Sequence, residues 1–137
     1  MSDPSQAVIQ EMFDAYGKGD ASRLESIVAA DVIYHLPGRT IGGEYRGRRA
    51  VFDLWERQKA HMGGRVYKVG VLETLAAGDK VVTLIAGTAE SSGRSLAWRG
   101  INFYRVSDGQ VAECRVFIDD LYSFDDFWAG IPASAHS

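Results

Sequence analysis

His35 lies in the short apolar run Val32–Leu36, directly before the turn residues Pro37 and Gly38. An imidazole exchanges protons near neutral pH, so a histidine where a strand meets a turn can serve as an acid or base in a pocket. The same histidine could instead hydrogen-bond a neighbour and only shape the cavity. His35 is therefore the first candidate catalytic residue, with these two interpretations open.

Asp119 follows the last predicted strand and is the second candidate. Its carboxylate would orient or charge His35, or act as the acid or base itself. Either Asp119 or Asp120, standing before Leu121, also fits the N-cap of a helix. We expect one of the two to be the cap and leave open which of them faces the pocket.

Asn102 lies inside a predicted strand and is the third candidate. Strand alternation places Asn102 on one face with Trp98 and Tyr104, and Ile101 and Phe103 on the other. A single amide among aromatic rings would give an apolar pocket one orienting hydrogen-bond donor. The alternative is a cross-strand hydrogen bond at an interface.

Composition limits the classes of partner. The chain has 137 residues, enough for one core, and 15 basic against 18 acidic residues give a net charge of -3. Phosphate binding needs a basic surface, so no nucleic-acid partner is expected. Neither a signal peptide nor a membrane-spanning run is visible, and the expected location is cytoplasmic, without a membrane partner. The single Cys114 and three scattered histidines predict neither a disulfide nor a metal site.

Apolar residues at helical spacing predict one helix from Pro4 behind an Asp3 cap, one capped by Asp20, and one around Val51–Gln58. Residues 31–35 are predicted to form a short strand. The glycine-rich stretch that follows, to Gly47, is predicted to be a lid or a long turn.

From residue 65 the pattern changes to long strands with short turns. The predicted strands are 65–76, 80–90, 95–106 and 110–118. Short turns indicate antiparallel pairing. Helices followed by such a sheet predict an α+β domain over residues 1–130, a curved sheet wrapped around the N-terminal helices with a pocket between them. Residues 131–137 are predicted to be a disordered tail.

Five segments carry a resemblance to a known family. They are Tyr16–Asp20, Ala30–Gly38, Tyr45–Val51, Phe103–Gly109 and Glu113–Asp119. In this order they resemble the SnoaL-like, ketosteroid-isomerase-related branch of the nuclear transport factor 2-like superfamily, over nearly the whole chain. The resemblance implies a cone-shaped fold with an apolar cavity, and a homodimer, because members often form dimers.

The resemblance also implies roles for the candidates. His35 stands where ketosteroid isomerase has its general base, and Asn102 aligns with its Asp oxyanion donor. Met12 aligns with its Tyr donor and cannot donate, which argues against steroid isomerisation. SnoaL-type cyclases use a late-strand Asp, which Asp119 matches.

Limonene-type epoxide hydrolases offer a second comparison within the resemblance. Their late-strand Asp also aligns with Asp119, but their Arg and Asp partners align with Thr83 and Ile85. Epoxide opening by that mechanism is therefore not expected.

Three hypotheses follow. The first is a cofactor-free isomerase, cyclase or dehydratase that moves a proton next to a carbonyl, with His35 as proton acceptor and Asp119 and Asn102 in support. The second is a non-catalytic binder of a small apolar or aromatic molecule. The third is a dimeric assembly module that uses the outer face of the sheet. The residues predicted to line the substrate pocket are Met12, Phe13, Tyr16, Trp55, Trp98, Tyr104 and Phe117.

Overall fold

A computed structural model describes residues 4–62, 67–91 and 93–131. Its elements are α1 (Pro4–Lys18), α2 (Ala21–Ile27), β1 (Val28–Leu36), β2 (Gly43–Arg46), α3 (Arg48–Met62), β3 (Tyr67–Ala77), β4 (Lys80–Ser91), β5 (Arg94–Ser107), β6 (Gln110–Ile118) and α4 (Leu121–Trp128). The predicted cap Asp3 and residues 132–137 of the predicted tail lie outside the described residues, whereas Ile131 packs against the core.

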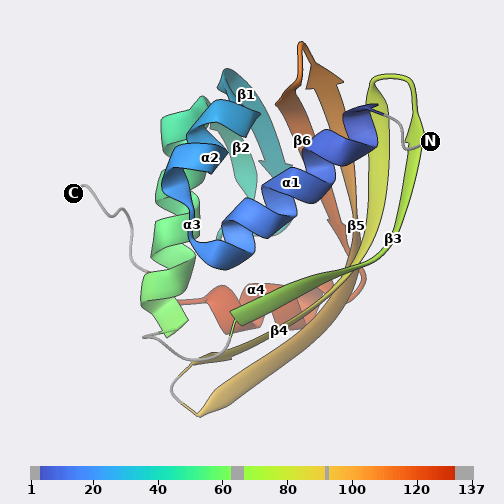
Figure 1. The fold of residues 1–137 in the computed structure, drawn as a ribbon. Helices are drawn as coiled ribbons and strands as arrows, with labels where there is room; N and C mark the ends of the chain where they lie inside the picture. The colour runs from blue at the N-terminus through green and yellow to red at the C-terminus, as the bar shows by residue number, and fades with distance from the viewer. Residues whose placement is uncertain (1–3, 63–66, 92, 132–137) are drawn as a thin grey trace.

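The strands form one sheet in the order β2-β1-β6-β5-β4-β3. Strand β1 runs parallel to β6, and the other neighbours are antiparallel. Figure 1 shows the sheet curving around one side of the molecule, with α1, α2 and α3 together on its inner face. The predicted α+β architecture, a mainly antiparallel curved sheet around N-terminal helices, is confirmed.

The region before α3 differs from the sequence prediction. The strand predicted at 31–35 is longer and begins at Val28, directly after α2. The glycine-rich stretch after it contains β2, which pairs with β1 at Ile33↔Arg46 and His35↔Glu44. Both differences have one cause: β1 lies between β2 and β6, and each neighbour supplies backbone hydrogen bonds that local sequence patterns do not reveal.

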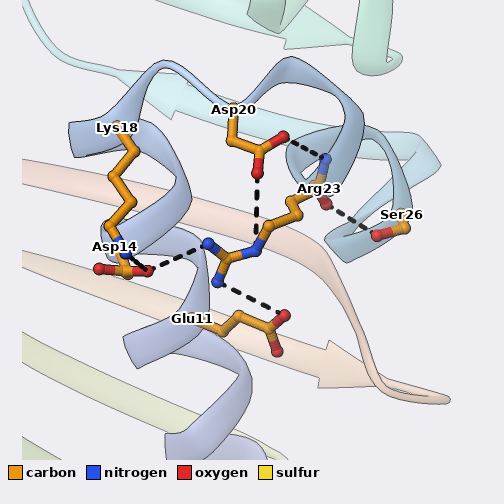
Figure 2. A network of polar contacts seen from close by, with 6 residues as sticks. All are labelled: Glu11, Asp14, Lys18, Asp20, Arg23 and Ser26. Carbon is orange, nitrogen blue, oxygen red and sulfur yellow. Dashed lines mark hydrogen bonds and ion pairs between the residues drawn. The ribbon is translucent and has the colours of Figure 1, made fainter.

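A network of charged side chains fixes the corner between α1 and α2 (Figure 2). The guanidinium of Arg23 lies 3.1 Å from Asp14 and 3.7 Å from Glu11, both on α1. Its backbone N–H donates to the capping carboxylate of Asp20, as predicted for the start of α2. The hydrogen bonds from Arg23 and Lys18 lower the pKa of Asp14. These exposed contacts orient the two helices and contribute little to stability.

Trp98 on β5 lies directly over Gly87 of β4, its Cα partner across the strand pair. A Cβ at residue 87 would overlap the six-membered ring of the indole. The absence of a side chain at Gly87 therefore lets Trp98 lie flat against the inner face of the sheet, where it contacts Phe124 of α4.

We expect Gly87→Ala to lower the free energy of unfolding by about 1–3 kcal/mol, because the Trp98 ring must move within a packed core. Gly17→Ala is the matched control: residue 17 is helical and a Cβ there meets nothing within 4 Å. This variant should gain about 0.5–1 kcal/mol from helix propensity. Urea unfolding of both proteins measures the difference, and a Gly87→Ala protein as stable as the wild type would contradict this packing.

Candidate functional site

A cavity lies between the inner face of the sheet and the helices, and the centres of water-sized groups have about 90 Å³ of space in it. Helices α1 and α3 supply the residues Met12, Phe13, Tyr16, Val51, Trp55 and Gln58. Strands β5 and β6 supply Trp98, Asn102, Tyr104, Cys114, Val116 and Ile118. The remaining lining is apolar apart from Tyr34, so the cavity is suited to a small hydrophobic ligand.

Aromatic side chains pack edge to face along the helical side of the cavity. The rings of Tyr16 and Trp55 are 5.1 Å apart, which joins α1 to α3. The ring of Phe13 meets that of Tyr104 at 6.3 Å, which joins α1 to β5. Such pairs hold large side chains in defined orientations, so the cavity walls are partly preorganised.

Polar groups in the cavity are few and uncharged. The side chain of Asn102 donates from Nδ2 to the hydroxyl oxygen of Tyr104 at 2.9 Å, and its Oδ1 has no partner. Gln58 of α3 is 5% exposed and also lines the cavity. These amides and the hydroxyls of the lining tyrosines are groups by which the described cavity walls could orient a ligand.

No lining residue among those described is Asp, Glu, His, Lys or Arg. Burial raises the pKa of Tyr104 well above its ordinary value, and burial likewise raises the pKa of the Cys114 thiol. Neither group ionises at neutral pH, so the described walls offer no ready proton acceptor.

His35 lies outside this lining, contrary to the expectation that it faces the pocket. Side chains of β1 alternate, and Val32, Tyr34 and Leu36 line the cavity. His35 points to the outer face, where its Nε2 lies 2.9 Å from Glu113 and its Nδ1 3.6 Å from Glu44. Its side chain is 20% exposed. A catalytic role of His35 remains an untested prediction, but its proton would be exchanged outside the cavity.

Asp119 and Asp120 also lie away from the cavity. Asp120 is the N-cap of α4 and accepts a hydrogen bond from the backbone N–H of Ser123. The Oδ1 of Asp119 accepts from the backbone N–H groups of Arg99 and Asp120. Asp119 borders a groove on the outer face. Neither Asp119 nor Asp120 lines the cavity.

Of the residues predicted to line the pocket, Met12, Phe13, Tyr16, Trp55, Trp98 and Tyr104 do line the cavity, as does Asn102. Phe117 is the exception: it is 52% exposed and lies on the outer face opposite Ile101. Its neighbours Val116 and Ile118 face the cavity instead, because alternate residues of β6 point to opposite faces. Substrate binding by the lining residues stays a prediction.

Gln58, Tyr34 and Cys114 are among the cavity residues that the sequence did not predict. Gln58 lies on the apolar stripe of α3, and a polar residue on such a stripe was the available signal. Tyr34 could have been found from alternation with Val32 and Leu36. Cys114 could not be distinguished from a core residue.

Within residues 4–62, 67–91 and 93–131, no three His, Cys, Asp or Glu side chains are grouped to hold a metal ion. Over the same residues, no helix has the length and apolar character to cross a bilayer.

Residues 9–114 match the model of the SnoaL-like domain family. The chain therefore belongs to the SnoaL-like family, as the segments noted above predicted, and it shares the fold of nuclear transport factor 2-like proteins. A search of curated proteins found no significant match.

Several solved structures have the same fold. Bal32a, from a soil-derived mobile gene cassette, is 28% identical with a TM-score of 0.87, covering 91% of this chain and 96% of its own. A protein of unknown function with a cystatin-like fold from Xanthomonas campestris is 27% identical, with a TM-score of 0.84 and coverages of 90% and 97%. A loop-truncation variant of IdmH is 26% identical, with a TM-score of 0.73 and coverages of 89% and 97%.

The buried Cys114 thiol provides a test of the cavity interior. We expect iodoacetamide to label native protein slowly between pH 7 and 9, because burial raises the pKa of the thiol and keeps it in the unreactive protonated form. Unfolding in urea should restore the rate of a free peptide thiol. Mass spectrometry follows the reaction, and native labelling at the unfolded rate would contradict the buried position.

Proposed function

We propose that the protein binds a small, uncharged, largely apolar molecule in the cavity, without acid–base chemistry by the described walls. The observation that carries this proposal is the composition of the described lining: many apolar and aromatic side chains, two amides, three tyrosines and no charged group. A charged ligand would lose its hydration and find no opposite charge there. The alternative considered from the sequence, a non-catalytic binder, is thus favoured over proton transfer by His35.

Similar structures agree with a small-molecule role. IdmH from Streptomyces antibioticus, whose truncated form resembles this chain, is a proposed polyketide cyclase. A carbon-rich ligand with few polar groups would suit the aromatic walls supplied by Tyr16, Trp55 and Trp98.

Binding of 2-naphthol, followed by NMR on methyl-labelled protein, tests this proposal. We expect intermolecular NOEs from the naphthol ring to Val51 and Val116, which line the cavity, and none to Val82 or Leu84 on the outer face. The anion 2-naphthoate should bind at least about tenfold more weakly, because its carboxylate has no cationic partner.

The His35→Ala variant is the matched control and should bind 2-naphthol as the wild type does, since its side chain lies outside the cavity. Loss of binding in this variant, or NOEs confined to the outer face, would overturn the proposal.

A second candidate function, homodimer assembly, is favoured by the outer face of the sheet. We define the outer patch as the apolar side chains that face away from the cavity on β3 to β6. They are Leu75, Val82, Leu84, Ile101, Phe103 and Phe117. Ile101 is 43% and Phe117 52% exposed, and neighbouring strands bring them together. A continuous apolar patch of this kind commonly marks a protein interface.

The charges beside the outer patch fit a second copy of the chain. Along its β1 and β2 side, Arg46, Glu44, His35, Glu113 and Arg105 form a row in which acidic and basic groups alternate. A row of both signs does not repel an identical surface, whereas a surface of one sign would. The outer patch would then form the apolar centre of the interface and this row part of its polar rim.

Light scattering tests the dimer. We expect the wild type to have about twice the chain mass of 15.0 kDa, and Phe117→Lys to be a monomer at the same concentration. A lysine in the centre of the outer patch would be desolvated without a partner. Tyr122→Lys, at a tyrosine on α4 that is 91% exposed and outside the outer patch, is the control and should remain a dimer. A monomeric wild type would contradict this assignment.

A further inference from the structure

Two primary amides on opposite walls of the cavity have unused hydrogen-bonding capacity. Gln58 on α3 is 5% exposed and Asn102 on β5 is 8% exposed. Both line the cavity. No described residue hydrogen-bonds to the side chain of Gln58, and Asn102 uses only its Nδ2, toward Tyr104, while its Oδ1 is unpartnered. Buried polar groups are nearly always paired in folded proteins, so the unpartnered Oδ1 of Asn102 requires an explanation.

Packing of α3 does not explain Gln58. The buried residues of this helix are Val51, Leu54, Gln58 and Met62, one stripe that faces the sheet. Leu54 and Met62, one turn before and after, are 0% and 2% exposed. An apolar side chain at residue 58 would continue the stripe without leaving an unpaired polar group. Packing of the stripe therefore does not require an amide at residue 58, and a ligand in the cavity would account for it.

The chemistry of an amide restricts that ligand. A primary amide has both N–H donors and a carbonyl acceptor, and it is neutral at all physiological pH values. It pairs well with a hydroxyl or a carbonyl group, and it cannot neutralise a carboxylate or an ammonium. Since the two amides come from the helix and the sheet, a ligand between them would be held at two points, with the aromatic walls in contact with its apolar frame.

We propose that Gln58 and Asn102 select an uncharged ligand with two hydroxyl or carbonyl groups, one paired with each amide. This inference rests on the proposed function, binding of a small apolar molecule in the cavity. Gln58 is then a specificity-determining residue. Its position on the apolar stripe of α3 serves ligand recognition instead of packing.

Three ligands of one ring system test the proposal: naphthalene, 2-naphthol and 2,6-dihydroxynaphthalene, titrated into the wild type and followed by NMR. We expect affinity to rise about 2- to 10-fold with each hydroxyl, the increment of one neutral hydrogen bond. Gln58→Met, which has a similar shape, should lose the increment of the second hydroxyl and keep its affinity for naphthalene.

Thermal unfolding of the Gln58→Met variant distinguishes a role of Gln58 in recognition from a role in the fold. Gln58→Met should unfold at the same temperature as the wild type or a higher one, because it extends the apolar stripe of α3 and removes no hydrogen bond between described residues. A lower unfolding temperature would indicate that the amide supports the fold. Gln10→Met, the same change at an exposed position of α1, is the control and should alter neither selectivity nor stability appreciably.

The outcomes separate this inference from the proposed function. Equal affinities of the wild type for all three ligands would overturn the inference and leave cavity binding intact. A Gln58→Met protein that keeps the full gain from the second hydroxyl would overturn the role of Gln58. Absence of binding for all three ligands would overturn both proposals.

Discussion

The alternation of side chains across β1, β5 and β6 determines what this protein presents to a ligand and what it presents to solvent. On the inner face, Tyr34, Asn102 and Val116 line the cavity. On the outer face, one residue further along each strand, His35 and Phe117 lie among charged and apolar side chains. A shift of one residue would exchange the two sets, so the strand register is the constraint on which cavity chemistry depends.

Helices α1 and α3 complete the cavity, because large aromatic side chains on them fill the space between the helices and the inner face of the sheet. Tyr16 and Trp55 contact each other, and Phe13 reaches Tyr104 on the sheet. Gly87 permits Trp98 to lie flat on the sheet. The polar groups left inside are neutral, and the low-dielectric surroundings raise the pKa values of Tyr104 and Cys114. The site is thus built to recognise shape and a few hydrogen bonds, not charge.

The sequence was sufficient for the architecture and for the aromatic part of the cavity walls. Helical spacing identified Met12, Phe13 and Tyr16, and alternation on β5 placed Asn102 beside Tyr104. The errors at His35 and Phe117 arose because alternation tells which residues share a face but not which face is inward. That choice depends on contacts between β1 and β6 that are 78 residues apart at His35 and Glu113. Gln58 was overlooked because a single polar residue on an apolar helix stripe does not by itself predict a cavity beside it.

A SnoaL-like fold can house catalysis or binding, and the location of ionisable groups distinguishes them. The most direct measurement is a crystal structure of the protein with 2,6-dihydroxynaphthalene. This account predicts ligand density between Gln58 and Asn102, with His35 still paired to Glu113 on the opposite face of the sheet. Ligand density beside His35, with the cavity filled by its own side chains, would contradict it.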